Sequence, residues 1–289
     1  MADVKHNARS QAGTQTCKVL VPVYRPLSDF EAAIVRHNLS LLSDHQAALF
    51  GPSSKRDILV STAETLIKDT GANITVECFD DHYFKDVYGY SQLLLAHEFF
   101  ERFKDVTHVL ICQTDALILS GNLQQWLETD YSYIGAPIFK GFAKPVMPPK
   151  FTNMLNGGLS LRNVGDAQRA LKKVSFLKKS KWSRVFKKLG LLLISNMVLR
   201  LIGRKSFVII NENVHEDVIW TGQIRACVPG FTTPGLDTAL RFAFEVLPRY
   251  LYEKNGRELP FGCHAFEAHD PDFWHEHFPK WTLEYRSDR

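Results

Sequence analysis

The chain has 289 residues, 45% of them hydrophobic, a composition typical of a globular protein with a sizeable core. This length allows one large α/β domain or two small ones. The first 15 residues are polar and hold no apolar stretch, which argues against a signal peptide and predicts a disordered lead-in over 1–16. The five cysteines are odd in number and show no CxxC spacing, so a reducing cytoplasm fits better than a disulfide framework.

The first 120 residues alternate between short apolar runs and amphipathic stretches. The expected strands are 18–24, 57–61, 74–79 and 109–112, and the expected helices are 29–42, 63–68 and 90–103. Ser28 is placed to cap the first helix. Such an alternation predicts a parallel, doubly wound sheet. No GxGxxG or GxxxxGK[ST] pattern follows the first strand, so a dinucleotide fold or a P-loop enzyme is disfavoured.

A single acid, Asp115, stands between the apolar runs 109–112 and 116–119. A carboxylate between two buried segments is costly unless it meets a metal, a cation or several hydrogen-bond donors. In open α/β sheets, ligands collect at the carboxyl ends of parallel strands, which is where Asp115 is expected. The alternative is a loop aspartate that caps the next turn.

The second half holds three further candidate segments. The paired glycines Gly157 and Gly158 precede an apolar strand and indicate close backbone approach, either to a neighbouring segment or to a ligand. Glu216 and Asp217 are expected in the first turn of a helix, as ordinary dipole partners or as a rigidly held general base. His264 follows Gly262 in a tight apolar turn and reads as a core histidine or a ligand. The run 242–245 receives no functional role.

One segment of the chain is strongly basic. Although the net charge is only +4, twelve Lys and Arg residues and no Asp or Glu lie between Gln168 and Asn211. Within it, 189–199 is uncharged, and its eleven residues are too few for a membrane span of about 20. With Trp182, Phe186 and the flanking lysines, this stretch predicts a helix lying in a membrane interface; the alternative is a buried helix with a solvated basic edge. Nucleic acid is disfavoured, because the cations alternate with aliphatic residues more than with stacking aromatics.

Taken together, these blocks resemble the GT-A class of nucleotide-sugar glycosyltransferases and, more closely, a little-characterised bacterial family within it. The resemblance runs from about residue 17 to 275. It is carried by six motifs, VPVY (21–24), QTDA (113–116), YIGAP (133–137), NGGLSLR (156–162), EDVIW (216–220) and PFGCHA (260–265). It implies an α/β, GT-A-like (Rossmann-related) fold, with a mostly parallel central sheet flanked by helices and a basic helical insertion.

The resemblance also implies a domain layout. A single catalytic domain would span 17–275, divided into a nucleotide-binding half (17–120) and an acceptor half (121–275). The basic amphipathic segment would be 168–206, and 276–289 would form a C-terminal tail.

Site roles follow from the same resemblance. Asp115 matches the last acid of the class's Asp-x-Asp motif and His264 a C-terminal histidine, so these two would hold a divalent cation; Gln113 replaces the first acid. Asp217, with Glu216 beside it, would be the catalytic base if the enzyme inverts. The donor-binding residues would be Pro22, Val23, Tyr24, Arg25, Gln113, Thr114, Asp115, Asn156, Gly157 and Gly158.

The expected activity is therefore hexosyl transfer from a nucleotide-sugar donor to a hydroxyl of a glycan or lipid-linked acceptor, in bacterial surface polysaccharide synthesis. Mg²⁺ needs only one or two carboxylates besides substrate phosphates, whereas Mn²⁺ better suits a site that includes an imidazole. The enzyme would be cytoplasmic and would dock on the anionic inner membrane surface through 172–205, without a nucleic-acid partner. The alternatives are a sugar-phosphate nucleotidyltransferase and a non-catalytic nucleotide- or glycan-binding module.

Overall fold

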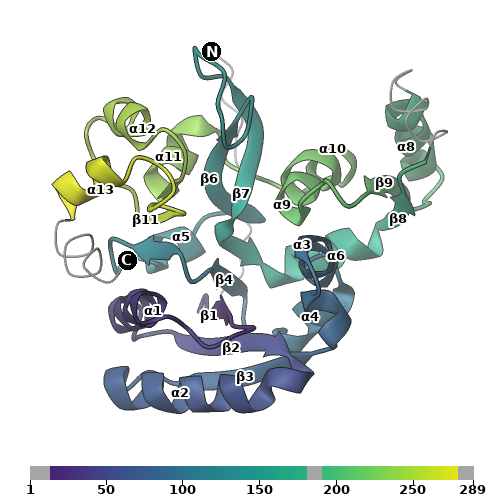
Figure 1. Ribbon diagram of the computed structural model, residues 1–289. Helices are drawn as coiled ribbons and strands as arrows, with labels where there is room; N and C mark the ends of the chain where they lie inside the picture. The colour runs from purple at the N-terminus through teal and green to yellow at the C-terminus, as the bar shows by residue number, and fades with distance from the viewer. Residues whose placement is uncertain (1–13, 181–190, 279–289) are drawn as a thin grey trace.

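The computed structural model describes residues 14–180 and 191–278. Its central sheet has six strands in the order β3-β2-β1-β4-β7-β6 (Figure 1). Strands β1 to β4 pair in parallel, and β7 runs antiparallel to both β4 and β6, so five of the six strands point the same way. The strands are β1 Cys17–Pro22, β2 Gln46–Pro52, β3 Ile74–Phe79, β4 His108–Cys112, β6 Tyr133–Phe139 and β7 Phe151–Asn163. The predicted α/β fold with a mostly parallel central sheet is confirmed.

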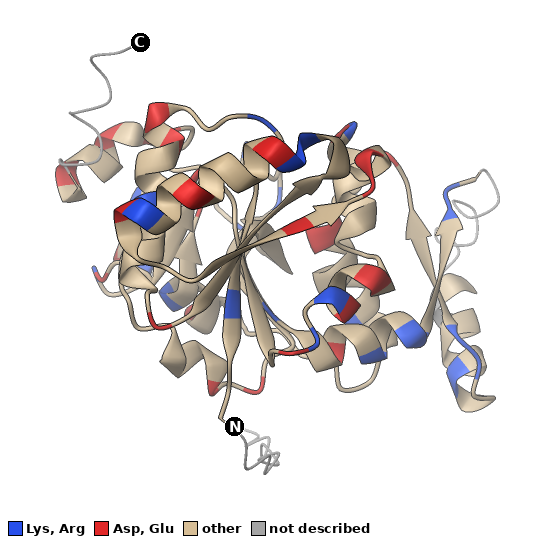
Figure 2. Ribbon diagram, turned by 90° about the horizontal axis from the view of Figure 1, so that it is seen from below, with Lys and Arg blue, Asp and Glu red and all other residues tan. Residues whose placement is uncertain are grey.

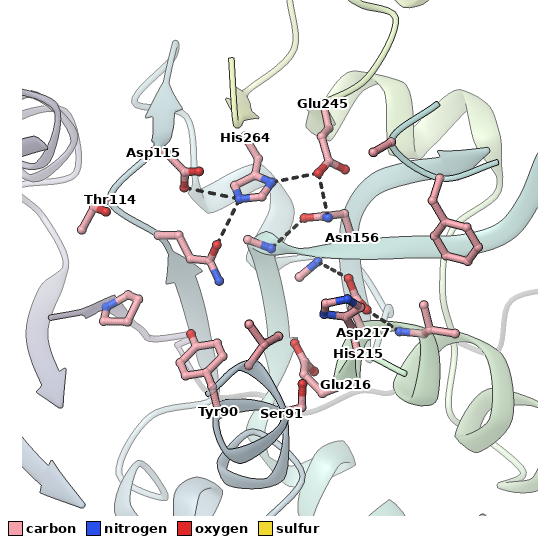
Figure 3. Close-up of a pocket in the computed structure, with 18 of the residues that line it drawn as sticks. Tyr90, Ser91, Thr114, Asp115, Asn156, His215, Glu216, Asp217, Glu245 and His264 are labelled. Atoms are coloured by element: carbon pink, nitrogen blue, oxygen red, sulfur yellow. Dashed lines mark hydrogen bonds and ion pairs between the residues drawn. The ribbon is translucent and has the colours of Figure 1, made fainter. Parts of the chain in front are cut away.

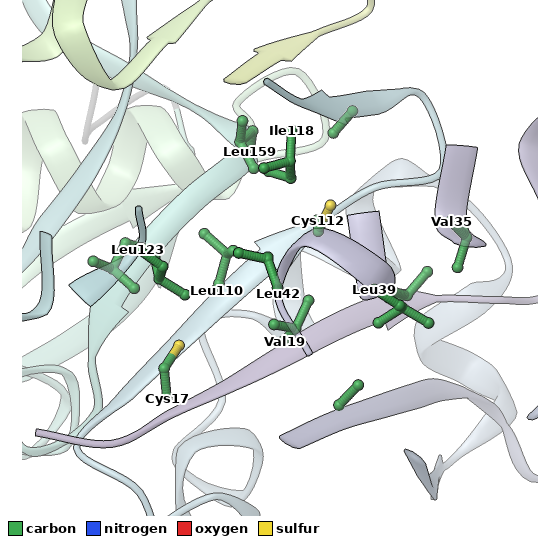
Figure 4. Packing of buried hydrophobic residues seen from close by; sticks show 14 of the residues in the cluster. Cys17, Val19, Val35, Leu39, Leu42, Leu110, Cys112, Ile118, Leu123 and Leu159 are labelled. Atoms are coloured by element: carbon green, nitrogen blue, oxygen red, sulfur yellow. The ribbon is translucent and has the colours of Figure 1, made fainter. Parts of the chain in front are cut away.

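Helices cover both faces of this sheet, and alternate residues of each strand serve the two faces. Val19 and Val21 of β1 join one core cluster, packed under α1 and α2 (Figure 4). Leu20 joins a second cluster on the other face, with α3, α4 and α6 Val164–Lys172. The helices of this half are α1 Asp29–Leu41, α2 Arg56–Thr70, α3 Val87–Leu93 and α4 His97–Arg102, with the short 3₁₀ turns η1 Ser53–Lys55 and η2 Asp81–Phe84. Ser28 caps α1, as predicted.

Two predicted elements of this half are wrong. The expected strand at 57–61 lies inside α2, where Leu59, Ala63 and Leu66 recur at helical spacing and face the core. The second strand is instead β2, whose Ala-Ala-Leu-Phe run is fully buried. The single helix expected over 90–103 is two helices, α3 and α4, separated by a break at 94–96.

A smaller sheet of three strands, in the order β10-β11-β5, joins the second half of the chain to the end of β4. Its strands are β5 Ala116–Ile118, β10 Ala243–Phe244 and β11 Gly262–His264. Around it pack α5 Gln124–Leu127, α11 Leu236–Phe242, α12 Pro248–Lys254 and α13 Pro271–His277, which enters the predicted tail. Because β4 pairs with β7, the predicted halves 17–120 and 121–275 share one sheet.

The basic segment begins with α6 Val164–Lys172 and continues into a lobe at one edge of the molecule (Figure 1). The segment 168–206 is not purely helical, because β8 Val174–Lys178 pairs in parallel with β9 Ser206–Ile210. The helix expected over 189–199 is present as α8 Leu191–Leu201, whereas Trp182 and Phe186 lie outside the described residues. No helix within the described ranges is both long and apolar enough to cross a membrane.

After β9 the chain forms a nearly continuous helical stretch with an unusual middle. It comprises α9 Glu216–Val218, a π-helix (η3, Ile219–Ile224) and α10 Arg225–Cys227. Single π-helical turns inside helices are frequently found at functional sites. Here the π-helical turn begins at Ile219, two residues after Asp217.

Candidate active site

A pocket of about 820 Å³ lies at the carboxyl ends of β1 and β4. Tyr24 and Arg25 follow β1, and Gln113 to Asp115 follow β4. Asp115 was expected at the carboxyl end of a parallel strand, and the pocket forms there. Its opposite wall comes from β7, α9 and the segment after β10 (Figure 3). All the predicted site residues line this pocket except Val23, which is 2% exposed and packs in the core. The donor-binding role of Val23 stays a prediction.

Asp115 and His264 meet at the centre of the pocket. Strand β11 pairs antiparallel with β5 so that His264 lies opposite Ala116, the residue after Asp115. His264 Nε2 is 3.4 Å from Asp115 Oδ1 and 3.0 Å from Gln113 Oε1. His264 is 9% exposed, so it is a buried histidine whose ring edge nonetheless faces the pocket.

Glu245, which the sequence analysis left without a role, is the other partner of His264. Its Oε1 lies 3.2 Å from His264 Nδ1 and accepts a 3.0 Å hydrogen bond from Asn156 Nδ2. Burial alone would lower the pKa of His264, but the carboxylates of Asp115 and Glu245 outweigh it and raise this pKa to about 10. The sequence signal was an acid directly after an aromatic strand, a pattern equally compatible with a half-buried strand and a helix edge.

The paired glycines allow two side chains to approach β7 closely. A Cβ atom on Gly158 would lie 2.0 Å from His264 Nε2, and one on Gly157 would lie 2.6 Å from Glu216 Oε1. Gly158 N–H also donates a 2.7 Å hydrogen bond to Asn156 Oδ1. The close approach expected at this motif is thus made to neighbouring side chains, and Asn156 has both ends of its amide engaged within the protein.

Glu216 forms a buried ion pair with Arg162 of β7. The guanidinium donates two hydrogen bonds to its carboxylate, of 2.7 and 2.9 Å, and stacks over the ring of Tyr133 at 4.8 Å. Both charged side chains are almost completely buried. This arrangement gives Glu216 a structural task, and the predicted catalytic role of Glu216 stays a prediction.

Asp217 is held differently from its neighbour. Its Oδ2 accepts a 3.1 Å hydrogen bond from Gly157 N–H, and its Oδ1 accepts one of 2.6 Å from Val218 N–H. The residue is 8% exposed and lines the pocket. Burial raises the pKa of Asp217 to about 6, against the pull of these hydrogen bonds. A rigidly held carboxylate with such a pKa suits proton abstraction near neutral pH.

The β1 end of the pocket is shaped by an ion pair. Arg25 donates two hydrogen bonds of 2.8 Å to Glu31 of α1, which also accepts one of 3.1 Å from Thr114. Burial would raise the pKa of Glu31, but hydrogen bonds from Arg25, Ser28 and Thr114 lower it to about 2. The opposite side of this end is formed by residues of η2 and α3 that the sequence analysis did not single out: Lys85, Asp86, Val87, Tyr90 and Ser91.

The pocket offers an incomplete set of ligands for a divalent cation. Within 14–180 and 191–278, no three His, Cys, Asp or Glu side chains cluster as a metal site. However, Asp115 Oδ1, His264 Nε2 and the amide oxygen of Gln113 converge on one point of the pocket wall. Oxygen and imidazole donors suit Mn²⁺, and substrate phosphates commonly complete such a coordination shell. The residues therefore fit a cation that binds together with a diphosphate and displaces the Nε2 proton of His264.

The sequence over residues 73–264 matches the model of a family described as "Protein of unknown function (DUF5672)". The chain belongs to the DUF5672 family. No curated protein matches the sequence significantly.

The DUF5672 chain is similar in structure to solved glycosyltransferases. The galactosyltransferase LgtC, solved with donor and acceptor sugar analogs, superimposes with a TM-score of 0.52 at 15% identity, over 93% of this chain and 99% of the other. The glycosyltransferase GlyE from Streptococcus pneumoniae gives 0.44 at 12% identity, over 94% and 61%. The mannosyltransferase PcManGT from Pyrobaculum calidifontis, solved with GDP-Man and Mn²⁺, gives 0.40 at 13% identity, over 78% and 56%. The similarity to LgtC supports the predicted GT-A-like fold.

Proposed function

We propose that this DUF5672 protein is a glycosyltransferase that moves a sugar from a nucleotide-sugar donor to an acceptor hydroxyl. The observation that carries the proposal is that one pocket holds two separate sets of side chains. Asp115 and His264 lie 3.4 Å apart at the carboxyl end of β4, and Asp217 stands on the opposite wall as a buried carboxylate. Glycosyl transfer from a nucleoside diphosphate needs both, because the leaving diphosphate must be neutralised and the incoming hydroxyl deprotonated.

The roles divide along the pocket. Pro22, Tyr24 and Arg25 would contact the nucleoside, and Arg25 would do so through the side of its guanidinium that Glu31 leaves free. Asp115 and His264, with Gln113 beside them, would hold a divalent cation, which when bound neutralises the leaving diphosphate. Asp217 would take the proton of the acceptor hydroxyl if the reaction inverts the anomeric centre. Asn156 would fix Glu245 and Gly158 through one bond at each end of its amide, and the second N–H would remain for the donor sugar.

The first test is thermal stabilisation by nucleotides. A ligand that binds only the native state raises its stability, so one nucleoside diphosphate out of a panel with Mn²⁺, Mg²⁺ or EDTA is expected to raise the melting temperature. Asp115→Ala should abolish the metal-dependent part of the shift, and Asp44→Ala, at an exposed turn, should not. A shift unaffected by EDTA would remove the cation from the proposal. No shift with any nucleotide would contradict the function.

The finer parts of the proposal concern the acceptor and the place of action. We propose a hexosyltransferase that uses a glycan or lipid-linked acceptor in surface polysaccharide synthesis and works at the anionic inner membrane surface. The support is the face of α8. Its buried side is fixed to β9 by Asn196, whose amide donates to Phe207 O and accepts from Phe207 N–H, at 2.9 and 2.7 Å. The opposite side exposes apolar side chains: Ile194, Met197, Val198, Leu201 and Ile202.

The charges around this face favour a lipid surface as its occupant. Arg200, Arg204 and Lys205 border it, and Figure 2 shows Lys and Arg without an acidic residue over β8 and α8. A second copy docked through the same face would bring like charges together. An anionic bilayer would instead attract the cations and accept the apolar side chains in its interface. The predicted alternative of a buried helix is not what the structure shows, since these side chains are about half or more exposed.

Vesicle flotation tests this surface. The protein is expected to bind vesicles of phosphatidylcholine with phosphatidylglycerol and to be released by salt, because the attraction is screened. The triple change of Arg200, Arg204 and Lys205 to Gln should weaken partitioning on the order of 100-fold. Leu201→Ser with Ile202→Ser should weaken it as well, whereas Leu41→Ser, an exposed leucine of α1, should not. Equal binding to vesicles without phosphatidylglycerol would contradict the electrostatic part.

A further inference from the structure

Glu245 carries a carboxylate oxygen with no partner inside the protein. Both of its hydrogen bonds, with His264 Nδ1 at 3.2 Å and from Asn156 Nδ2 at 3.0 Å, use Oε1. Among the residues that the structure describes, no hydrogen bond reaches Oε2. The side chain is 16% exposed and lines the pocket between His264 and Asn156 (Figure 3). A carboxylate has capacity for several donors, so Oε2 is available to a donor from a bound ligand.

The position of Glu245 places this oxygen at the sugar end of the pocket. It lies on the far side of His264 from Asp115, on the wall that also carries Asn156 and Asp217 (Figure 3). The two carboxylates are close enough that the charge of Glu245 contributes to the raised pKa of Asp217. A group held between the cation-binding pair and the candidate base would be the one that is transferred.

The Lys and Arg side chains near the pocket either pair with an acidic side chain or lie on another side of the pocket. Arg25 pairs with Glu31 at the nucleoside end, His264 lies between Asp115 and Glu245, and Lys85 belongs to the η2–α3 side. Behind the wall, the guanidinium of Arg162 is taken by Glu216. Among the described residues, Arg25 and Lys85 are the only Lys or Arg side chains that line the pocket, so neither stands beside Asp217 and Glu245, where the exposed His215 is the neighbouring basic group (Figure 3). A carboxylate on the sugar would be placed against two like charges, whereas sugar hydroxyls would find charged acceptors.

Resting on the proposed function, we propose that Glu245 is a specificity-determining residue: its Oε2 accepts a hydroxyl of the transferred sugar, and the site selects a neutral hexose over a uronic acid. Oε1 serves a second purpose, since a carboxylate on the far nitrogen of a ligand histidine fixes its ring orientation. Oε1 thus positions His264, and Oε2 binds the sugar hydroxyl. The division predicts that the two tasks can be separated by mutation.

Glu245→Gln makes this separation. The glutamine keeps an amide oxygen for His264 and Asn156, and it replaces Oε2 by an NH₂ group that donates. Calorimetric titration would use three ligands with Mn²⁺: the nucleoside diphosphate selected by the thermal panel, its neutral hexose ester and its uronic acid ester. In the wild type, the hexose ester is expected to bind on the order of 100-fold more tightly than the uronate ester. In Glu245→Gln, hexose-ester binding should fall roughly 10- to 100-fold and uronate-ester binding should improve, with diphosphate binding unchanged.

Controls keep the outcomes apart. Glu258→Gln, at an exposed position outside the pocket, should leave all three affinities as in the wild type. Glu245→Ala removes both oxygens and is expected to weaken the diphosphate as well, because His264 loses its orienting partner. If Glu245→Gln weakens the diphosphate and its hexose ester equally, Glu245 only positions His264 and the sugar assignment is wrong. If hexose and uronate esters bind alike in the wild type, the selectivity is wrong. If the wild type binds none of the three ligands, the proposed function itself is contradicted.

Discussion

Replacing Asp217 by Asn is expected to lower kcat for sugar transfer by about 10²- to 10⁴-fold while nucleotide binding is retained, because general-base catalysis typically contributes that much. The asparagine keeps the size of the side chain at the start of α9 but cannot accept the proton of the acceptor hydroxyl. The effect is measured by steady-state kinetics with the donor that the thermal panel identifies. The matched control is Asp237→Asn, at an exposed acid in the first turn of α11, which should leave kcat unchanged.

The pH dependence of kcat/KM in the wild type should also report Asp217 as the base. Only ionised Asp217 is a base, and burial raises its pKa to about 6. The value of kcat/KM is therefore expected to fall about tenfold per pH unit below about 6 and to level off above it. Asp217→Asn should lose this acid limb. If the variant keeps both the rate and the limb, another group removes the proton, and Asp217 serves only to fix Gly157 through its 3.1 Å hydrogen bond.

Glu216→Gln is expected to destabilise the fold by about 3–5 kcal/mol, because it leaves the buried guanidinium of Arg162 without its counter-charge. The pair is almost fully buried and joined by hydrogen bonds of 2.7 and 2.9 Å, so water cannot replace the lost partner. Urea unfolding followed by tryptophan fluorescence measures the change. The exposed pair of Glu253 on α12 and Arg257 just after this helix gives the contrast, and Glu253→Gln should change stability little.

A double variant separates the charge from the packing. Arg162→Met combined with Glu216→Leu removes both charges, and replacement of a buried pair by apolar residues is often neutral or stabilising. The double variant is therefore expected to be more stable than Glu216→Gln alone. Equal destabilisation of the two would show that the cost comes from packing around Tyr133 instead of from an uncompensated charge.

Local patterns were enough to single out candidate acids that line one pocket. Asp115 follows a short apolar strand and Asp217 begins a helix, and both features depend on residues within a few positions in the chain. The α/β alternation likewise predicted a parallel sheet, even though one strand was misplaced. At 57–61 the pattern of branched apolar residues suggested a strand, but the spacing of Leu59, Ala63 and Leu66 places this stretch on a helix face.

Partnerships between distant residues were decided by tertiary structure. Gln113 and His264 stand 151 positions apart and meet because β11 pairs with β5 in one register. Glu245 was assigned no role because its meaning depends on His264 and Asn156, neither of which is near it in the sequence.

The sequence by itself thus determined the class of fold and the candidate acids of the site, because strand and helix periodicity and the residues at element ends are local properties. Tertiary structure decided which of those acids has no ion-pair partner in the wall of the pocket. Glu216 and Asp217 are adjacent and chemically alike, yet Arg162 from β7 takes the first, and Gly157 of the same strand leaves the second facing the pocket. That difference arises from the pairing of β7 with β4 and its packing on α9, and contacts of this range are not encoded in local sequence pattern.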